Sequence, residues 1–217
     1  MGRGSRGSFH DIPGQLLLPL EPARQGLEPS PFERDAWRRG EDKVFFALLP
    51  GAAMAGSIFA FAEEERRRSQ LDGIPRPARV LHVSLNHVGT SSALPPEVLA
   101  RASQAASTVA IARFELTFDQ LQSFKSEKRR PVVLLCGEGL AQLTALRAAI
   151  GEALLRQGLA QGFDTRAVPH MTLLYDTKSF ADVALEAPIV MPVTDFVLVR
   201  SLYGKAEYQE LGRWALR

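Results

Sequence analysis

A five-residue pattern with a histidine and a hydroxyl residue among apolar neighbours occurs twice in this chain, as Leu-His-Val-Ser-Leu and as Pro-His-Met-Thr-Leu. In the first copy His82 precedes Ser84 by two residues. In the second copy, 88 positions further on (170 − 82), His170 precedes Thr172. Alternate side chains of a β-strand point to the same face. The pattern therefore predicts two strands that each present one imidazole and one hydroxyl on a single face.

The repetition indicates chemistry as well as structure. Apolar residues make up 46% of the chain, which has four histidines. By composition alone, roughly 2% of histidines would begin a His-apolar-hydroxyl-apolar pattern. Chance therefore does not account for two copies. An imidazole titrates near neutral pH, so one histidine can accept a proton while the other donates one. Two such strands around one anion could act on a phosphodiester without a metal; the alternative is that each histidine is a structural or solvated strand residue.

These motifs resemble those of the two-histidine (2H) phosphoesterases, and more closely those of bacterial RNA 2',3'-cyclic phosphodiesterases, also called 2'-5' RNA ligases. The resemblance covers residues 43–217, with Lys43–Pro50 similar to the family's opening strand and Tyr208–Leu216 to its closing strand. It implies an α+β fold of two pseudo-symmetric lobes, each an antiparallel sheet backed by helices, around a central cleft. Residues 1–42, with 6 Gly and 5 Pro and no periodicity, are predicted to be a flexible N-terminal extension.

Hydrophobic periodicity and turn residues predict the order of elements independently. Strands are expected at 43–49, 80–88, 108–117, 130–136, 168–176, 193–202 and 208–216, and helices from residue 51 to 70, 95 to 106 and 138 to 157. Short strands joined by turns and single helices are typical of α+β proteins.

The resemblance assigns roles to the motif residues. It implies that His82 and His170 are catalytic and that the hydroxyls of Ser84 and Thr172 bind phosphate. Many relatives have an arginine shortly after the second motif, whereas this chain has Tyr175 between Leu174 and Asp176. The resemblance therefore supplies no phosphate-binding arginine at that position.

Four further residues are candidate substrate contacts. Arg76 and Arg79 precede the first motif strand and could meet phosphate, with ordinary surface charge as the alternative. Strand alternation places Asn86 on the motif face and aims Tyr175 away from it, unless a bulge interrupts the strand. By the same alternation His87 faces away from the motif.

Composition sets the remaining expectations. The single cysteine, Cys136, allows no intramolecular disulfide, which favours a reducing compartment, and it ends an apolar run as a buried structural thiol would. The net charge of +2 is too small to indicate nucleic-acid binding by itself. No segment has the continuous apolar length of a membrane span. We expect a cytoplasmic monomer without a cofactor or a bound metal.

The leading functional hypothesis is an enzyme that hydrolyses RNA 2',3'-cyclic phosphate ends, with 2'-5' ligation as the reverse reaction. Two alternatives stay open: a non-catalytic RNA- or nucleotide-binding module, and a phosphodiesterase that acts on a small cyclic nucleotide. Binding alone does not require two imidazoles, and this favours an enzyme.

Overall fold

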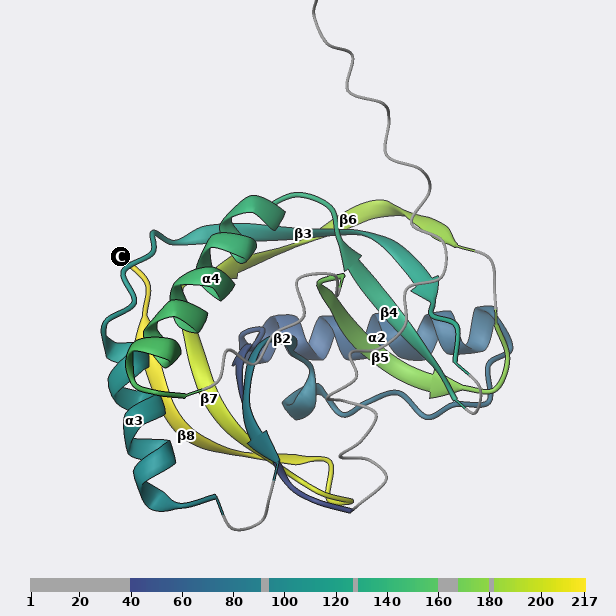
Figure 1. The fold of residues 1–217 in the computed structure, drawn as a ribbon. Coiled ribbons are helices and arrows are strands. Elements are labelled where there is room, and N and C mark those ends of the chain that lie inside the picture. The colour runs from purple at the N-terminus through teal and green to yellow at the C-terminus, as the bar shows by residue number, and fades with distance from the viewer. Residues whose placement is uncertain (1–39, 91–93, 127–128, 160–167, 180–181) are drawn as a thin grey trace, which may run out of the picture.

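One antiparallel sheet, wrapped on one side by helices, organises the chain (Figure 1). The computed structural model describes residues 40–90, 94–126, 129–159, 168–179 and 182–217. In these residues the eight strands are β1 (Lys43–Leu48), β2 (Val83–Thr90), β3 (Phe114–Ser123), β4 (Arg130–Cys136), β5 (His170–Asp176), β6 (Val183–Val193), β7 (Asp195–Leu202) and β8 (Glu207–Ala215). The helices are α2 (Ala52–Arg68), α3 (Pro96–Ser107) and α4 (Leu140–Arg156), with a 3-10 turn η1 (Ala78–Val80).

The strand order divides the sheet into two similar halves. It runs β6-β3-β4-β5-β2-β1-β7-β8, so each half has four antiparallel strands and places one motif strand at the centre. The halves meet where β2 pairs with β5 at Val83 and Met171. The predicted α+β architecture with two related halves is confirmed.

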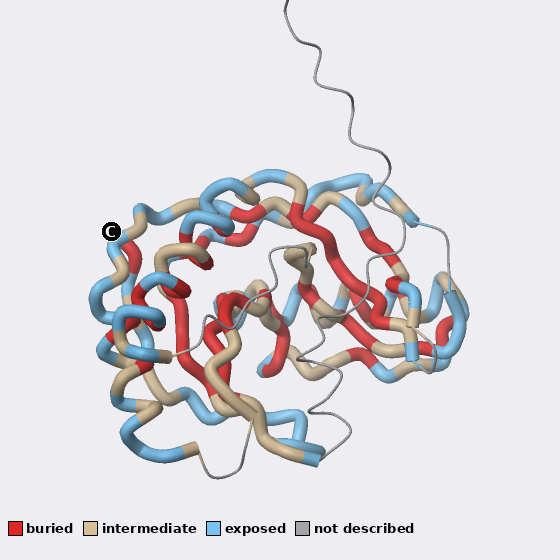
Figure 2. The backbone as a smooth tube through the Cα atoms, viewed as in Figure 1, coloured by how far each residue is buried: buried red, intermediate tan, exposed pale blue. Residues whose placement is uncertain are grey.

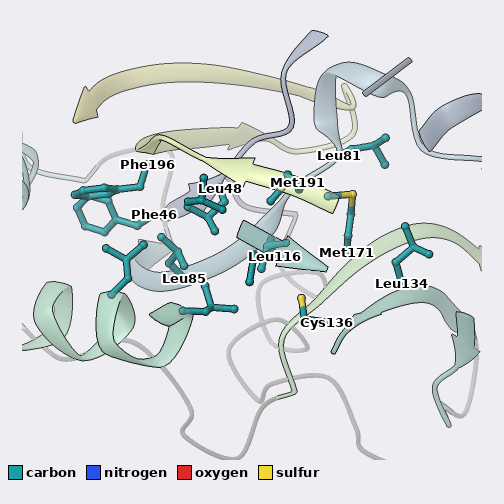
Figure 3. Packing of buried hydrophobic residues seen from close by; sticks show 14 of the residues in the cluster. Phe46, Leu48, Leu81, Leu85, Leu116, Leu134, Cys136, Met171, Met191 and Phe196 are labelled. Carbon is teal, nitrogen blue, oxygen red and sulfur yellow. The ribbon is translucent and has the colours of Figure 1, made fainter. Parts of the chain in front are cut away.

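All three described helices pack on the same side of the sheet. Side chains such as Ile58 of α2, Ala105 of α3 and Leu146 of α4 belong to one buried cluster with the inward-facing side chains of the strands. Figure 3 shows Met171 and Leu134 among these packed residues. In Figure 2 buried backbone follows the central strands, while much of the helix backbone is exposed. Burial of this apolar surface is the main force that joins the halves.

Helix α4 shows how the pattern of the sequence leads to this packing. Leu143, Leu146, Ile150 and Leu154 recur at intervals of three or four residues, and each is fully buried. The helix begins after Gly139, whose φ of +85° lies in the left-handed region that favours glycine. The predicted role of this stripe as core packing is confirmed.

The predicted strands differ from the structure in three places. The strand predicted at 80–88 begins only at Val83, because Ala78–Val80 form the turn η1. Alternation predicts a strand at 108–117, but β3 begins only at Phe114. The preceding residues bond to the chain end, where Arg217 N donates to Ile111 O at 3.0 Å and Arg113 N to Arg217 O at 2.9 Å. The sequence does not predict β6, which contains Pro188 and Pro192; it is an edge strand of the sheet, where a missing backbone donor is tolerated.

Among the described helices, none has the length and apolar character needed to cross a lipid bilayer.

Candidate active site

The side of the sheet away from the helices, which we call the site face, carries both motifs. Ala47 of β1 pairs with Ser84, and Val133 of β4 pairs with Thr172. Ala47 and Val133 belong to small apolar clusters that are separate from the main core. Their pairing partners therefore lie on this face as well, and the histidines two residues before them follow by alternation.

The register between β2 and β5 brings the motifs together. Because Val83 pairs with Met171 in an antiparallel arrangement, extending the register by one residue sets His82 against Thr172 and Ser84 against His170. Directly opposed side chains in such a pair lie about 4.5–5.5 Å apart at Cβ. The two imidazoles and two hydroxyls thus form a diagonal arrangement around one point of the site face.

Each imidazole is oriented by a backbone carbonyl two residues earlier. His82 Nδ1 lies 3.0 Å from Val80 O, and His170 Nδ1 lies 2.8 Å from Val168 O. A carbonyl oxygen only accepts, so Nδ1 carries the proton and donates in both cases. Nε2 is then the atom of each ring that exchanges protons with a substrate.

The ring of His82 has further partners. Its Nε2 accepts from Ser84 Oγ at 3.1 Å, and the Tyr208 hydroxyl lies 2.9 Å from Nδ1. Tyr208 and Phe45 also pack on the imidazole, with ring centroids 5.4 and 5.2 Å away. These contacts leave the ring little freedom to rotate.

His170 rests on aromatic packing of its own. The Phe124 ring meets it edge to face at 5.0 Å, and Phe124 is buried with Val133 and Leu135. Each histidine therefore stands on a small apolar cluster of its own half of the sheet. No sequence motif marks Tyr208, Phe45 or Phe124, because only the pairing of distant strands brings β8, β1 and the residue after β3 beside the motif histidines.

Burial has a strong effect on His82. Desolvation, together with the positive charge of Arg76, lowers its pKa from 6.5 to about 3, although the bond to Val80 O acts in the opposite direction. His170 and Lys43 add smaller contributions in the same sense. His82 is therefore neutral at physiological pH, and its Nε2 has a lone pair that can accept a proton.

A bulge in β2 changes the faces of the residues after Ser84. Ala47 pairs with Ser84 and Phe45 with His87, so two residues of β1 oppose three of β2. His87 consequently lies on the site face, where its Nε2 is 3.0 Å from Thr90 Oγ1. Burial and the charge of Lys43 lower the pKa of His87 to about 4.

The same bulge corrects the prediction for Asn86. Asn86 does not share the motif face; it is fully buried on the helix side, where its Nδ2 donates to Arg147 O at 3.1 Å. Arg147 in turn donates from Nη2 to Ser84 O at 2.5 Å. Asn86 thus bonds helix α4 to the strand beside the bulge, on the opposite side of the sheet from the motif histidines.

A matching bulge in β5 corrects the prediction for Tyr175. Val133 pairs with Thr172 and Val132 with Leu174, so Leu173 is an extra residue in the strand. Tyr175 then pairs with Pro131 and lies on the site face instead of facing away from it. Each motif strand therefore has a bulge after its hydroxyl residue, which turns the third residue beyond, His87 or Tyr175, toward the site.

The two candidate arginines occupy different environments. The Arg76 guanidinium lies over the Tyr175 ring, with Cζ 5.9 Å from the centroid, and its charge acts on His82. Arg79 belongs to η1 and is exposed. The structure thus brings Arg76 to the site with Tyr175, and places Arg79 on the surface of η1.

No group of three or more His, Cys, Asp or Glu residues that could hold a metal ion occurs in the described ranges. Cys136 is buried in the main core, as its sequence context predicts.

The fold and the paired His-x-Ser/Thr motifs define a two-histidine phosphoesterase. The chain belongs to the 2'-5' RNA ligase superfamily, whose family model matches residues 57–204. The name of this family refers to an enzyme that acts on phosphodiester bonds.

Solved structures agree with this membership. Apo LigT of Escherichia coli is 25% identical and superimposes with a TM-score of 0.64, covering 81% of this chain and 98% of LigT. LigT complexed with 3'-AMP gives 23% identity and a TM-score of 0.66 over the same shares. A protein of Thermus thermophilus, with the same coverage, is 24% identical with a TM-score of 0.59. A search of curated proteins gives no match.

Proposed function

We propose that this protein hydrolyses 2',3'-cyclic phosphate ends of RNA by acid–base catalysis with His82 and His170. The observation that carries the proposal is the arrangement of the two motifs on one face. Two imidazoles, each held by a carbonyl at Nδ1, are interleaved with two hydroxyls across the pair Val83–Met171. This arrangement offers a base, an acid and neutral donors within the span of one phosphoryl group.

We assign His82 the role of the base because its lowered pKa keeps the imidazole neutral at physiological pH, with a lone pair on Nε2. Its Nε2 accepts a proton from water as the water oxygen bonds to phosphorus, and the bond from phosphorus to one ribose oxygen breaks. His170 donates its Nε2 proton to that leaving oxygen. The reaction leaves His82 protonated, His170 neutral and a phosphate monoester on the ribose, and proton exchange with solvent restores the enzyme.

The two hydroxyls stabilise charge on the phosphoryl oxygens. Ser84 donates to His82 Nε2 in the free enzyme, and rotation about its side-chain bond redirects the same proton to a bound phosphoryl oxygen. Thr172 lies opposite His82 in the register, and its hydroxyl donates to a second phosphoryl oxygen. With a 5'-hydroxyl in place of water as the nucleophile, and with the ribose 3'-oxygen as the leaving group that takes the proton, the same step forms a 2'-5' linkage.

RNA is the substrate that the family description favours, because its name refers to RNA ligation. The complex of E. coli LigT with 3'-AMP supports a ligand with phosphate on the ribose. A small cyclic nucleotide contains the same reacting group, so substrate length has to be tested directly.

The test is to incubate the full chain with a short RNA that ends in a 2',3'-cyclic phosphate, in EDTA, and to identify the product by mass spectrometry. We expect conversion to a phosphate monoester, faster on RNA than on a 2',3'-cyclic mononucleotide. The matched control is the double variant His82→Ala/His170→Ala. A folded wild-type protein that turns over neither substrate would refute the proposed reaction, and loss of activity in EDTA would refute its independence of metal.

A further inference from the structure

The loop between α2 and η1 is fastened tightly to β5. Gly73 N donates to the buried carboxylate of Asp176 at 2.6 Å, and Arg76 N donates to Leu173 O at 2.7 Å. A Cβ at Gly73 would lie 2.3 Å from Tyr175 O, so the backbones approach more closely than a side chain would permit. This loop is therefore held in one position relative to the second motif strand.

Asp176 contributes to this attachment as a carboxylate. Burial acts to raise its pKa, but donation from the backbone N–H groups of Lys178, Gly73 and their neighbours outweighs burial and lowers the pKa. Lys178 adds a bond from Nζ to Gln70 O at 2.7 Å and an ion pair with Asp72 at 3.0 Å. The loop is thus anchored at Gln70, Asp72 and Gly73, and at the backbone of Arg76 itself.

The fastened loop presents Arg76 to the site. Its guanidinium lies 5.9 Å from the centroid of the Tyr175 ring, within the range of a cation–π contact. Its Nε is buried and has no hydrogen-bond partner among the described residues. A buried donor without a partner is uncommon in native proteins and requires an explanation, of which an absent ligand is one.

The position of Arg76 follows from the register. Beyond Thr172, which is opposite His82, β5 continues past the beginning of β2, and the bulge at Leu173 turns Tyr175 to the site face. Arg76 bonds to Leu173 itself. The cation therefore stands at the His82–Thr172 end of the site, where its positive charge helps to lower the pKa of His82.

We propose that Arg76 is the cation that binds the phosphoryl group at this site and that Tyr175 is the platform that holds it. The inference rests on the proposed function, which it deepens by naming the charged contact to substrate. A guanidinium offers donors in a planar fork that matches two phosphoryl oxygens. Stacking on Tyr175 limits its motion before substrate arrives, while Ser84 and Thr172 supply the neutral donors.

Phosphate binding tests this role separately from turnover. We would measure the Kd of inorganic phosphate by calorimetry for wild type, Arg76→Gln and Arg76→Lys. The surface variant Arg67→Gln is the matched control, because Arg67 lies on α2 in an exposed ion pair with Glu64. A hydrogen bond to a charged group contributes about 1.5–3 kcal/mol, so Arg76→Gln should weaken phosphate binding by roughly 10-fold to 10²-fold. Arg76→Lys should retain part of the affinity, and Arg67→Gln should equal wild type.

Tyr175 variants keep the proposal testable if Arg76→Gln does not fold. Tyr175→Leu retains the cation but removes its platform, and should weaken phosphate binding by roughly 3-fold to 10-fold, whereas Tyr175→Phe keeps the aromatic face and should bind as wild type does. Wild-type phosphate affinity in folded Arg76→Gln, or in Tyr175→Leu, would overturn the proposal. So would a wild-type protein that does not bind phosphate. Wild type that binds phosphate through Arg76 but leaves the cyclic RNA uncut would refute only the proposed reaction.

Discussion

Val83 of β2 and Met171 of β5 are backbone partners, and each is the residue between the histidine and the hydroxyl of its motif. Both side chains are fully buried in the main core. The contact that joins the two halves of the sheet is therefore also the centre of the candidate active site. Any change that slips this register by one residue would turn one motif toward the helices.

The roles of the two histidines can be tested by single replacements. Because base and acid act in the same step, His82→Ala and His170→Ala should each lower kcat on the cyclic-phosphate RNA by roughly 10²-fold to 10⁴-fold. The double variant should lose little more than the worse single variant, since residues that act as a unit are not additive. Steady-state kinetics measures all three. Near-normal turnover in both single variants would contradict the two-histidine mechanism.

The hydroxyls should matter less than the histidines. Loss of one preorganised donor costs about 2.7–4 kcal/mol in well-enclosed oxyanion sites, but water can partly replace a hydroxyl that is only half buried, as Ser84 and Thr172 are. We expect Ser84→Ala and Thr172→Ala each to reduce kcat/KM by roughly 10-fold to 10²-fold. Ser84→Thr and Thr172→Ser, which keep the hydroxyl, serve as controls. A loss in either Ala variant that equals that of His170→Ala would assign the hydroxyl a role in proton transfer.

Acid should destabilise the protein through two partly buried histidines whose pKa values are lowered, His82 and His87. The pKa of His82 is about 3 in the folded chain and near 6.5 in the unfolded chain, so below pH 6.5 the unfolded state binds the proton first. This stability is present above pH 6.5 and is lost as pH falls toward 3, at up to about 1.4 kcal/mol per pH unit. Urea unfolding at pH 7, 6 and 5 should show a smaller slope with pH for His82→Gln than for wild type. Equal slopes would contradict the burial of His82.

His87 should contribute to the same slope. Its pKa is lowered to about 4, so its stabilising effect is lost from pH 6.5 down to that value. The free energy of unfolding of the double variant His82→Gln/His87→Gln should therefore depend on pH less than that of His82→Gln alone.

Asn86 provides a test of the bulge in β2. Its buried amide donates to Arg147 O, so Asn86→Ala leaves that carbonyl without the bond and should lower the free energy of unfolding by about 1–3 kcal/mol. The side chain is on the helix side, so phosphate affinity should change less than 2-fold in the folded variant. Urea unfolding and calorimetry report the two effects. A large loss of phosphate affinity at unchanged stability would place Asn86 in the binding site after all.

The predicted N-terminal extension is residues 1–42, and we expect its residues 1–39 to be dispensable. Residues 1–39 lie outside the described part of the structure, whereas Asp42 Oδ1 accepts a bond from Tyr203 N at 2.9 Å. Deletion of residues 1–39 should leave Tm within a few degrees of the full chain and kcat/KM within about 2-fold, because the segment lacks the pattern of a core element. Thermal unfolding and turnover check this directly. Insoluble or inactive truncated protein would show that the segment belongs to the fold.

The sequence by itself determined the parts of this protein that depend on local periodicity. Strand β4 lies at Arg130–Cys136 as predicted, and the stripe of α4 is buried as predicted. The alternation around each motif histidine also predicts that the histidine and the hydroxyl share one face. This prediction needs only three consecutive residues of extended chain. These features require no knowledge of which strands are neighbours.

Only the tertiary structure decided what surrounds the motifs. The bulges that turn His87 and Tyr175 toward the site arise where β2 and β5 pair out of step with β1 and β4. The alternation of residues within one strand cannot predict this register. Arg76 reaches the site because its loop bonds to β5, almost a hundred positions later in the chain. Tyr208 meets His82 because β8 follows β7 and β1 in the sheet. Pairing between distant strands sets these contacts. That pairing is stabilised by the burial of apolar surface in the whole core.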